Sequence, residues 1–225
     1  MSPTDKLKPR PYDREFCVLC NEKKPLTGEH IFAAWIGKAI GYDSRKSSDI
    51  FGLDQDLTYT PINEEHSQRK LRILCGDCNN HWGSDLQTAT SKFLKPLLLG
   101  ETFTLDNNEC EILTRWVTCF VMVREFGHPT LVSITSQARK TFRDVFTIPE
   151  GTRIWIGRFD GVERNLTSWH RSLAWNMAAV APEHPDTFFM LFAIAKVVIF
   201  VFGSSSPQLK YSDDLHIFEL RKYVE

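Results

Sequence analysis

The chain has 225 residues, of which 42% are hydrophobic, 12% aromatic and 24% charged, and its formal net charge is −1. These values are typical of a globular protein with a buried core, and the aromatic content excludes an intrinsically disordered chain. The near-zero charge excludes a protein that coats nucleic acid by overall attraction, so any contact with phosphate must be local.

The N-terminal segment MSPTDKLKPRPYDREF is polar and lacks the apolar stretch of a secretory signal. The most apolar segment, Phe188–Phe202, is shorter than a membrane span and carries Lys196 near its middle. We therefore expect a cytoplasmic protein that makes no contact with a membrane. In that compartment disulfides are rare, and paired cysteines more often bind metal.

The first region, residues 1–100, is polar and is predicted to form one domain. Its long stretch Gly41–Lys70 shows neither helical nor strand periodicity, which predicts an extended loop. After Cys78 the run Asn79-Asn80-His81-Trp82 leads into a helix that we expect over Trp82–Leu99.

The second region, residues 101–225, is predicted to be a separate α+β domain of unknown role. Apolar residues recur every three or four positions in Glu109–Phe126, which predicts an amphipathic helix, and a shorter helix is expected over Ser136–Phe146. Strand-like segments follow, the third of which reads as two adjoining strands or one long bent strand: Arg153–Phe159, Ser172–Val180, Phe188–Phe202 and His216–Leu220.

Four of the six cysteines form two CxxC motifs, Cys17-Val-Leu-Cys20 and Cys75-Gly-Asp-Cys78. A CxxC turn directs two thiolates to one point, and two such turns complete a tetrahedral Zn²⁺ site. We therefore predict structural zinc on these four residues, with two metal-free dithiols as the alternative. Cys110 and Cys119 lie in the predicted amphipathic helix and are expected to be packing residues.

The same metal would bring together polar residues that flank the two motifs. Glu29-His30 follows the first motif, and Asn79 follows the second directly. The oxygens of Glu29 and Asn79 suit Mg²⁺ or Mn²⁺, and a neutral imidazole can take a proton from water. The alternatives are purely structural roles: a helix-terminal charge for Glu29, a capping or core side chain for His30 and a helix cap for Asn79.

The order CVLC…GEHI…CGDCNNHW resembles the four-cysteine branch of the HNH (ββα-metal, His-Me finger) endonucleases, over about Phe16–Leu86. The resemblance implies an α+β chain in which a zinc-stabilised ββα-metal nuclease lobe precedes a mixed helical and antiparallel-sheet C-terminal region. It also implies that Glu29 and Asn79 bind the catalytic metal, that His30 is the general base, and that the four cysteines bind zinc. A wider likeness to little-characterised bacterial HNH-type proteins covers later segments, including KPLLLG and GTRIWIGRFDG.

The sequence departs from the family pattern at two positions. Many HNH enzymes carry an asparagine on the strand about five residues before the third cysteine, where this chain has Lys70. The last histidine of the family's name would fall one helical turn after Asn79, where this chain has Gly83.

From these features we predict a metal-dependent HNH-type endonuclease that hydrolyses phosphodiester bonds in DNA, with double-stranded DNA as its partner. The resemblance alone suggests a phage-defence or mobile-element effector. Basic residues near the proposed site are predicted to contact phosphate, although interleaved acids make a solvated surface nearly as good an interpretation. These residues are Lys38, Arg69, Lys70 and Arg72.

The alternative is a zinc-ribbon module without catalysis that binds nucleic acid or a protein through the Gly41–Lys70 stretch. The role of the C-terminal region stays open between a specificity domain, a surface for self-association and a binding site for a regulatory partner.

Overall fold

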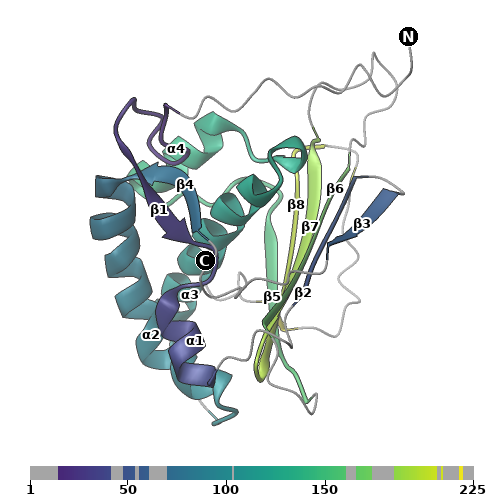
Figure 1. The fold of residues 1–225 in the computed structure, drawn as a ribbon. Helices are drawn as coiled ribbons and strands as arrows, with labels where there is room; N and C mark the ends of the chain where they lie inside the picture. The colour runs from purple at the N-terminus through teal and green to yellow at the C-terminus, as the bar shows by residue number, and fades with distance from the viewer. Residues whose placement is uncertain are drawn as a thin grey trace.

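The chain folds as a mixed α+β protein in which helices lie on one face of a large sheet (Figure 1). The structure is a computed structural model, and it describes residues 15–41, 48–53, 56–60, 70–102, 104–160, 166–173, 185–206, 209 and 218–219. In this part of the chain, no helix combines the length and the apolar character that a bilayer crossing requires.

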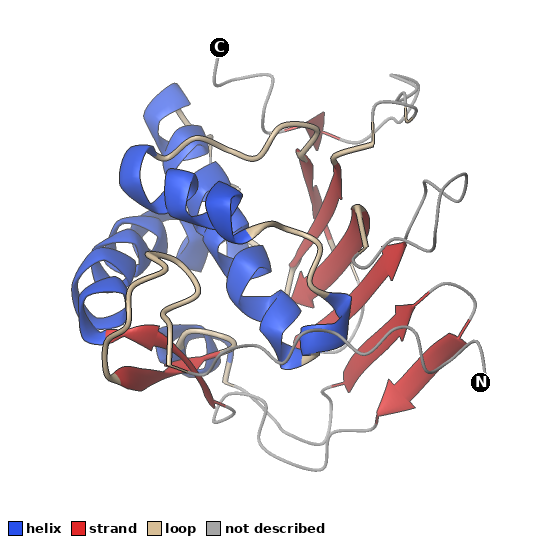
Figure 2. Cartoon of the chain, turned by 90° about the horizontal axis from the view of Figure 1, so that it is seen from above, coloured by secondary structure: helices blue, strands red, loops and turns tan. Residues whose placement is uncertain are grey.

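The cysteine lobe, residues 15–41 and 70–98, is built from two strands and three helical segments. Strand β1 (Leu26–His30) pairs antiparallel with β4 (Lys70–Cys75), with His30 opposite Lys70. Helix α1 (Ala34–Ile40) follows β1, while a π-helix (Asp77–Gly83) follows β4 and continues into α2 (Ser84–Leu98). The helix expected over Trp82–Leu99 is thus confirmed, although helical backbone begins earlier. Figure 2 shows the β1–β4 pair on the helical side of the molecule, apart from the large sheet.

Helix α3 (Asn107–Arg124) is the central element of the helical layer and confirms the predicted amphipathic helix. It begins at a capping box. The Asp106 side chain accepts from the Glu109 backbone N–H, and the Glu109 side chain accepts from the Asp106 backbone N–H. Its Phe120 ring lies 5.0 Å from Phe32 of the cysteine lobe and 4.5 Å from Phe192 of the large sheet. The helix therefore joins the two parts of the core.

The shorter predicted helix is also confirmed, as α4 (Ser136–Val145). The Thr135 hydroxyl caps its first turn by accepting from the Ala138 N–H, and Phe146 ends it in the left-handed conformation. Helix α4 packs against the core through its buried side chains Arg139 and Phe142.

The large sheet has the strand order β3-β2-β6-β7-β8-β5-β9 within the described residues. Neighbouring strands are antiparallel except β2 and β6, which are parallel. The apolar segment Phe188–Phe202 contains two adjoining strands joined by a tight turn at Ala195-Lys196, as one of the two interpretations predicted. The strands are β2 (Ser48–Leu53), β3 (Asp56–Thr60), β5 (Arg153–Arg158), β6 (Leu166–Leu173), β7 (Thr187–Ile194), β8 (Val197–Ser204) and β9 (Phe218–Glu219).

The prediction of a loop over Gly41–Lys70 is wrong, because β2 and β3 lie within it. The two strands pair antiparallel with each other, and β2 also pairs with β6 of the second region, a long-range pairing that local periodicity does not signal. Of the strand predicted over Ser172–Val180, Ser172 and Leu173 lie in β6, which begins earlier at Leu166, and residues 174–180 lie outside the described part.

Contacts cross the predicted domain boundary at residue 100. Strand β2 of the first region pairs with β6 of the second, and α2 packs along α3. The Lys196 N–H of the β7–β8 turn also donates to the Leu98 carbonyl at the end of α2. The division into residues 1–100 and 101–225 stays a prediction.

Candidate metal centre and adjoining cavity

The four cysteines of the CxxC motifs converge on one point in the cysteine lobe. All four are buried, and their Sγ atoms lie within 4.8 Å of one another. The Sγ atoms of Cys20 and Cys75 are 3.8 Å apart, too far for a disulfide. A tetrahedral zinc with bonds of about 2.3 Å separates its sulfur ligands by roughly 3.8 Å. The cluster therefore fits a structural metal ion such as Zn²⁺.

Backbone hydrogen bonds hold the first motif against the second. A turn closes between the Cys17 N–H and the Glu22 carbonyl, with Asn21 in a left-handed conformation. The Val18 N–H then donates to the Ile73 carbonyl of β4 at 3.0 Å. Because β4 ends in Cys75, this bond sets the two pairs of sulfurs face to face.

The electrostatics of the sulfur cluster also favour a cation. A hydrogen bond from the Cys78 thiol lowers the pKa of Cys17 to about 4, and that interaction together with burial raises the pKa of Cys78. Burial likewise raises the pKa of Cys20 to about 11. Ionisation of one thiol thus makes ionisation of its neighbours less favourable, and a bound divalent cation would remove this penalty.

Helix α4 reaches the cysteine cluster with two arginines. The Arg139 Nε donates to the Val18 carbonyl at 2.8 Å, and its guanidinium lies 4.8 Å from the centre of the Phe126 ring. The Arg143 guanidinium hydrogen-bonds the Cys78 sulfur, which raises the pKa of Arg143. A positive charge beside a tetrathiolate offsets part of its negative charge, so the C-terminal region supports the metal centre.

Next to the cluster lies a cavity of about 340 Å³ between β1, the π-helix with α2, and α3. Three residues predicted for catalysis and metal binding, Glu29, His30 and Asn79, all line this site cavity. Apolar side chains of α3 line the opposite wall, among them Trp116 and Phe120.

The Asn79 amide ties the start of the helix to β1. Its Nδ2 donates to Thr27 Oγ1 at 2.9 Å and to the Gly28 carbonyl at 3.3 Å. The Thr27 hydroxyl in turn donates to the Leu74 carbonyl of β4. With the NH₂ end held this way, the Oδ1 end of Asn79 has no hydrogen-bond donor among the described residues and can accept or ligate a cation.

Glu29 makes no hydrogen bond or ion pair with any residue that the structure describes. Its side chain is partly buried, and burial raises its pKa to about 7. The negative charge of Glu29 adds to burial in raising the pKa of Cys119, which lines the same cavity. A carboxylate in such surroundings costs free energy until a cation or donor joins it.

His30 stands at the end of β1, directly opposite Lys70 of β4. Burial and the positive charge of Lys70 both lower the pKa of His30, so its imidazole is neutral at physiological pH. The strand position at which the family carries asparagine is therefore occupied by a cation that faces His30.

Gly83, at the position of the family's last histidine, has no room for a side chain. A Cβ built there would lie 2.7 Å from the Cys78 carbonyl oxygen, which the π-helical backbone brings close. The departure from the family pattern thus has a backbone cause, and the missing side chain leaves space in the cavity that Gly83 lines.

The basic residues predicted to bind substrate do not line the cavity. Lys38 is exposed on α1, and Lys70 and Arg72 are exposed on β4. Arg69 lies outside the described residues. Lys38, Lys70 and Arg72 thus lie on the surface of the cysteine lobe, and the proposed contact of all four residues with phosphate stays a prediction.

Sequence reasoning missed polar residues of the cavity on α2, Ser84 and, more notably, Gln87. Its Oε1 accepts from the Trp35 indole of α1 at 3.1 Å and from the Trp116 indole of α3 at 2.8 Å. Trp116 comes from the second region of the chain, so no local spacing signals this cluster.

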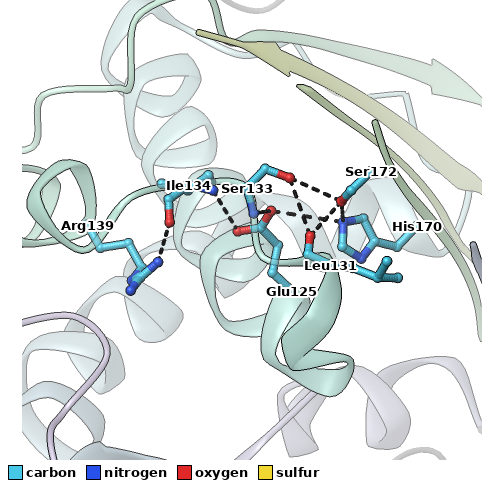
Figure 3. A network of polar contacts seen from close by, with 7 residues as sticks. All are labelled: Glu125, Leu131, Ser133, Ile134, Arg139, His170 and Ser172. Atoms are coloured by element: carbon cyan, nitrogen blue, oxygen red, sulfur yellow. Dashed lines mark hydrogen bonds and ion pairs between the residues drawn. The ribbon is translucent and has the colours of Figure 1, made fainter. Parts of the chain in front are cut away.

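A second polar network lies at the core between α3 and the large sheet (Figure 3). Glu125 accepts from the Ser133 and Ile134 N–H groups at 2.8 and 3.3 Å. His170 of β6 places its Nε2 3.2 Å from Ser172 Oγ and 4.0 Å from Glu125 Oε1. Both partners face the same ring nitrogen, and Glu125, His170 and Ser172 are fully buried, so this is no serine–histidine–acid relay.

Burial dominates the ionisation of this network. It raises the pKa of Glu125 to about 7, although the two N–H donors and the charge of Arg139 act in the opposite direction. Burial also lowers the pKa of His170 to about 3, helped by the charge of Arg124. Both groups are neutral in mildly acidic solution, and the network serves the packing of the core.

Comparison of the chain with protein-family models, with curated proteins and with solved structures gave no match. The residues of the cysteine lobe and its cavity are therefore the basis for inferring a function.

Proposed function

We propose that the chain is a metal-dependent endonuclease that hydrolyses phosphodiester bonds in DNA. The observation that carries the proposal is Glu29, a carboxylate without a described partner in a cavity that also holds His30 and the Oδ1 end of Asn79. Carboxylate and amide oxygens beside an imidazole form the donor set that a hard cation and a general base require.

The order of elements in the cysteine lobe supports the same proposal. The antiparallel strands β1 and β4 precede a helix, with one cysteine pair before β1 and the other where β4 meets that helix. The resemblance to the HNH family implies this order, with the metal acid and the base at the end of the first strand and an amide at the start of the helix. Zinc on the four cysteines then holds the fold and takes no part in hydrolysis.

In the proposed reaction, His30 accepts a proton from a water molecule whose oxygen forms a bond to phosphorus. The bond from phosphorus to the 3′ oxygen breaks, and the released oxygen takes a proton from solvent. The products carry a 5′-phosphate and a 3′-hydroxyl. Glu29 and Asn79 would hold Mg²⁺ or Mn²⁺, which supplies positive charge next to the phosphate.

Lys70 and the apolar wall contribute to this chemistry through His30. Burial and the charge of Lys70 keep the imidazole neutral, which is the form that accepts a proton. Exposed Lys38, Lys70 and Arg72 surround the lobe and are proposed to contact phosphates that flank the cleaved bond. An effector role in defence or in a mobile element is proposed on the family likeness alone.

A plasmid-nicking assay with Mg²⁺ or Mn²⁺ tests the proposal, together with a panel of single-stranded, branched and RNA substrates. We expect His30→Ala to reduce the rate by about 10²- to 10⁴-fold, the usual contribution of a general base. His81→Ala is the matched control, because His81 is exposed on the π-helix and does not line the cavity. Equal cleavage by folded His30→Ala and wild type would contradict the mechanism.

One observation favours a second candidate, a zinc module that binds without catalysis. Among the described residues that line the cavity there is no lysine or arginine, so none of them offers a permanent positive charge to bind a phosphate. Binding of DNA or protein without cleavage of any substrate in the panel would support this candidate and reject the nuclease.

A further inference from the structure

The side-chain amide of Gln87 is fixed in one orientation at the junction of three helices. Its Oε1 receives hydrogen bonds from the Trp35 indole of α1 and the Trp116 indole of α3. An indole N–H donates and never accepts, so only the oxygen end of the amide can face these two rings. The orientation is therefore set by chemistry, and the NH₂ end faces away from both indoles.

The NH₂ group of Gln87 makes no hydrogen bond within the described residues, although the side chain is only partly exposed. Gln87 lines the site cavity together with Glu29 and His30. Two N–H donors are thus held in place beside the proposed site and left to solvent or to a ligand oxygen. Because the Gln87 side chain is already held through its oxygen, it loses little conformational entropy when such a ligand binds.

The charge of the cavity indicates which ligand needs these donors. The described lining holds the acid Glu29 and no lysine or arginine. A phosphodiester carries one negative charge that its two non-bridging oxygens share, and a single cation on Glu29 would be close to only part of that charge. Preorganised neutral donors are the remaining way to stabilise it in a partly buried site.

We propose that the Gln87 NH₂ group donates a hydrogen bond to a non-bridging oxygen of the bound phosphodiester. This inference rests on the proposed nuclease function and adds a substrate-contacting residue to it. Trp35 and Trp116 act as positioning residues, because they hold the amide through its oxygen.

The substitution Gln87→Glu isolates the donor. It keeps an oxygen that accepts from both indoles, and it replaces the NH₂ group by a second oxygen with a negative charge. The matched control is Thr88→Glu, which adds the same charge at the next, exposed position of α2, outside the cavity lining. Both variants are compared at pH 8 over a range of Mg²⁺ concentrations, so that a change in metal affinity is seen separately.

We expect Gln87→Glu to lower kcat/KM for duplex cleavage by about 100-fold, with a melting temperature close to that of wild type. Thr88→Glu should cut at nearly the wild-type rate. Equal rates for the two variants would overturn the inference and leave the nuclease proposal intact. If wild type neither binds nor cuts any substrate, the proposed function and this inference fail together.

A second measurement needs only the wild-type protein. The two side-chain amide protons of Gln87 should shift in NMR spectra when a short DNA duplex is added with Ca²⁺, which supports binding without turnover. Unchanged amide signals in a saturated complex would overturn the inference even if Gln87→Glu failed to fold.

Discussion

Two glutamates of this chain have the same raised pKa in opposite surroundings. Burial raises the pKa of both Glu29 and Glu125 to about 7. Glu125 is fully buried and accepts from two backbone N–H groups, with His170 near its carboxylate. Glu29 lines a cavity and has no partner among the described residues.

The difference teaches that a displaced pKa does not by itself mark a functional site. The Glu125 carboxylate accepts from two N–H groups inside the core, which account for it, although Nδ1 of the neighbouring His170 is buried without a hydrogen-bond partner among the described residues. Glu29 has no such donors among the described residues, and we propose that a cation entering the cavity binds it. The contrast between the two glutamates depends on the cavity that the cysteine lobe forms and on this proposed cation.

Removal of the structural metal should have the largest effect on stability. It should unfold the cysteine lobe, which contains Glu29, and leave the large sheet next to Glu125 folded. Zinc bound to a cysteine cluster of this kind contributes on the order of 10 kcal/mol to folding. In hydrogen exchange after chelation, or in Cys78→Ser, the amides of β1 and β4 should lose protection while those of β7 and β8 keep it. Uniform loss across both sheets would show that the two parts unfold as one unit.

The Glu125 network should produce a pH-dependent stability that Glu125→Gln removes. A carboxyl pKa raised from 4.5 to about 7 stabilises the fold fully below about pH 4.5, and this contribution is lost as the pH rises through about 7. The depressed pKa of His170 acts in the opposite sense, since its contribution is complete above about pH 6.5 and is lost as the pH falls toward 3. Arg139 and Arg124, which face the two groups, stay charged throughout.

Because His170 is present in both proteins, the difference between wild type and Glu125→Gln isolates the carboxyl group. Between pH 5 and pH 8 the wild type should lose about 3 kcal/mol of unfolding free energy relative to the variant, at 1.36 kcal/mol per pKa unit. Urea unfolding of zinc-loaded protein at several pH values measures it. Parallel curves for the two proteins would mean that the internal hydrogen bonds of Glu125 outweigh its burial.

A smaller effect of defined sign is expected for Glu29→Gln. At pH 8 without added Mg²⁺, the variant should be more stable than wild type by about 1 kcal/mol, because it removes an unpaired charge from a partly buried site. Glu101→Gln, at an exposed position, is the control and should change stability by less than about 0.5 kcal/mol. A clear loss of stability in Glu29→Gln would reveal an internal partner for Glu29.

Local sequence signals predicted part of this fold and of the site. The CxxC spacing encodes the convergence of four sulfurs, and the apolar repeat encodes α3. The proximity of Glu29, His30 and Asn79 followed from the positions of the two CxxC motifs, since one metal on both motifs brings the flanking residues together, and all three line one cavity. Their proposed roles came from the resemblance.

The remainder depends on contacts between distant segments. Strands β2 and β3 pair with each other, and β2 also pairs with β6, far along the chain, so part of this pairing is set by a distant segment that the local sequence does not signal. The orientation of Gln87 depends on Trp116 from another helix, and the pKa of His30 depends on Lys70 from another strand. Only the assembled fold reveals these relations.

The most direct test of the central claim is a Mn²⁺ titration of zinc-loaded protein by calorimetry or electron paramagnetic resonance. Wild type and Glu125→Gln should bind one Mn²⁺ with similar affinity, whereas Glu29→Gln should lose that binding and Asn79→Ala should weaken it. Mn²⁺ binding that is unchanged in Glu29→Gln, or absent from wild type, would contradict the account.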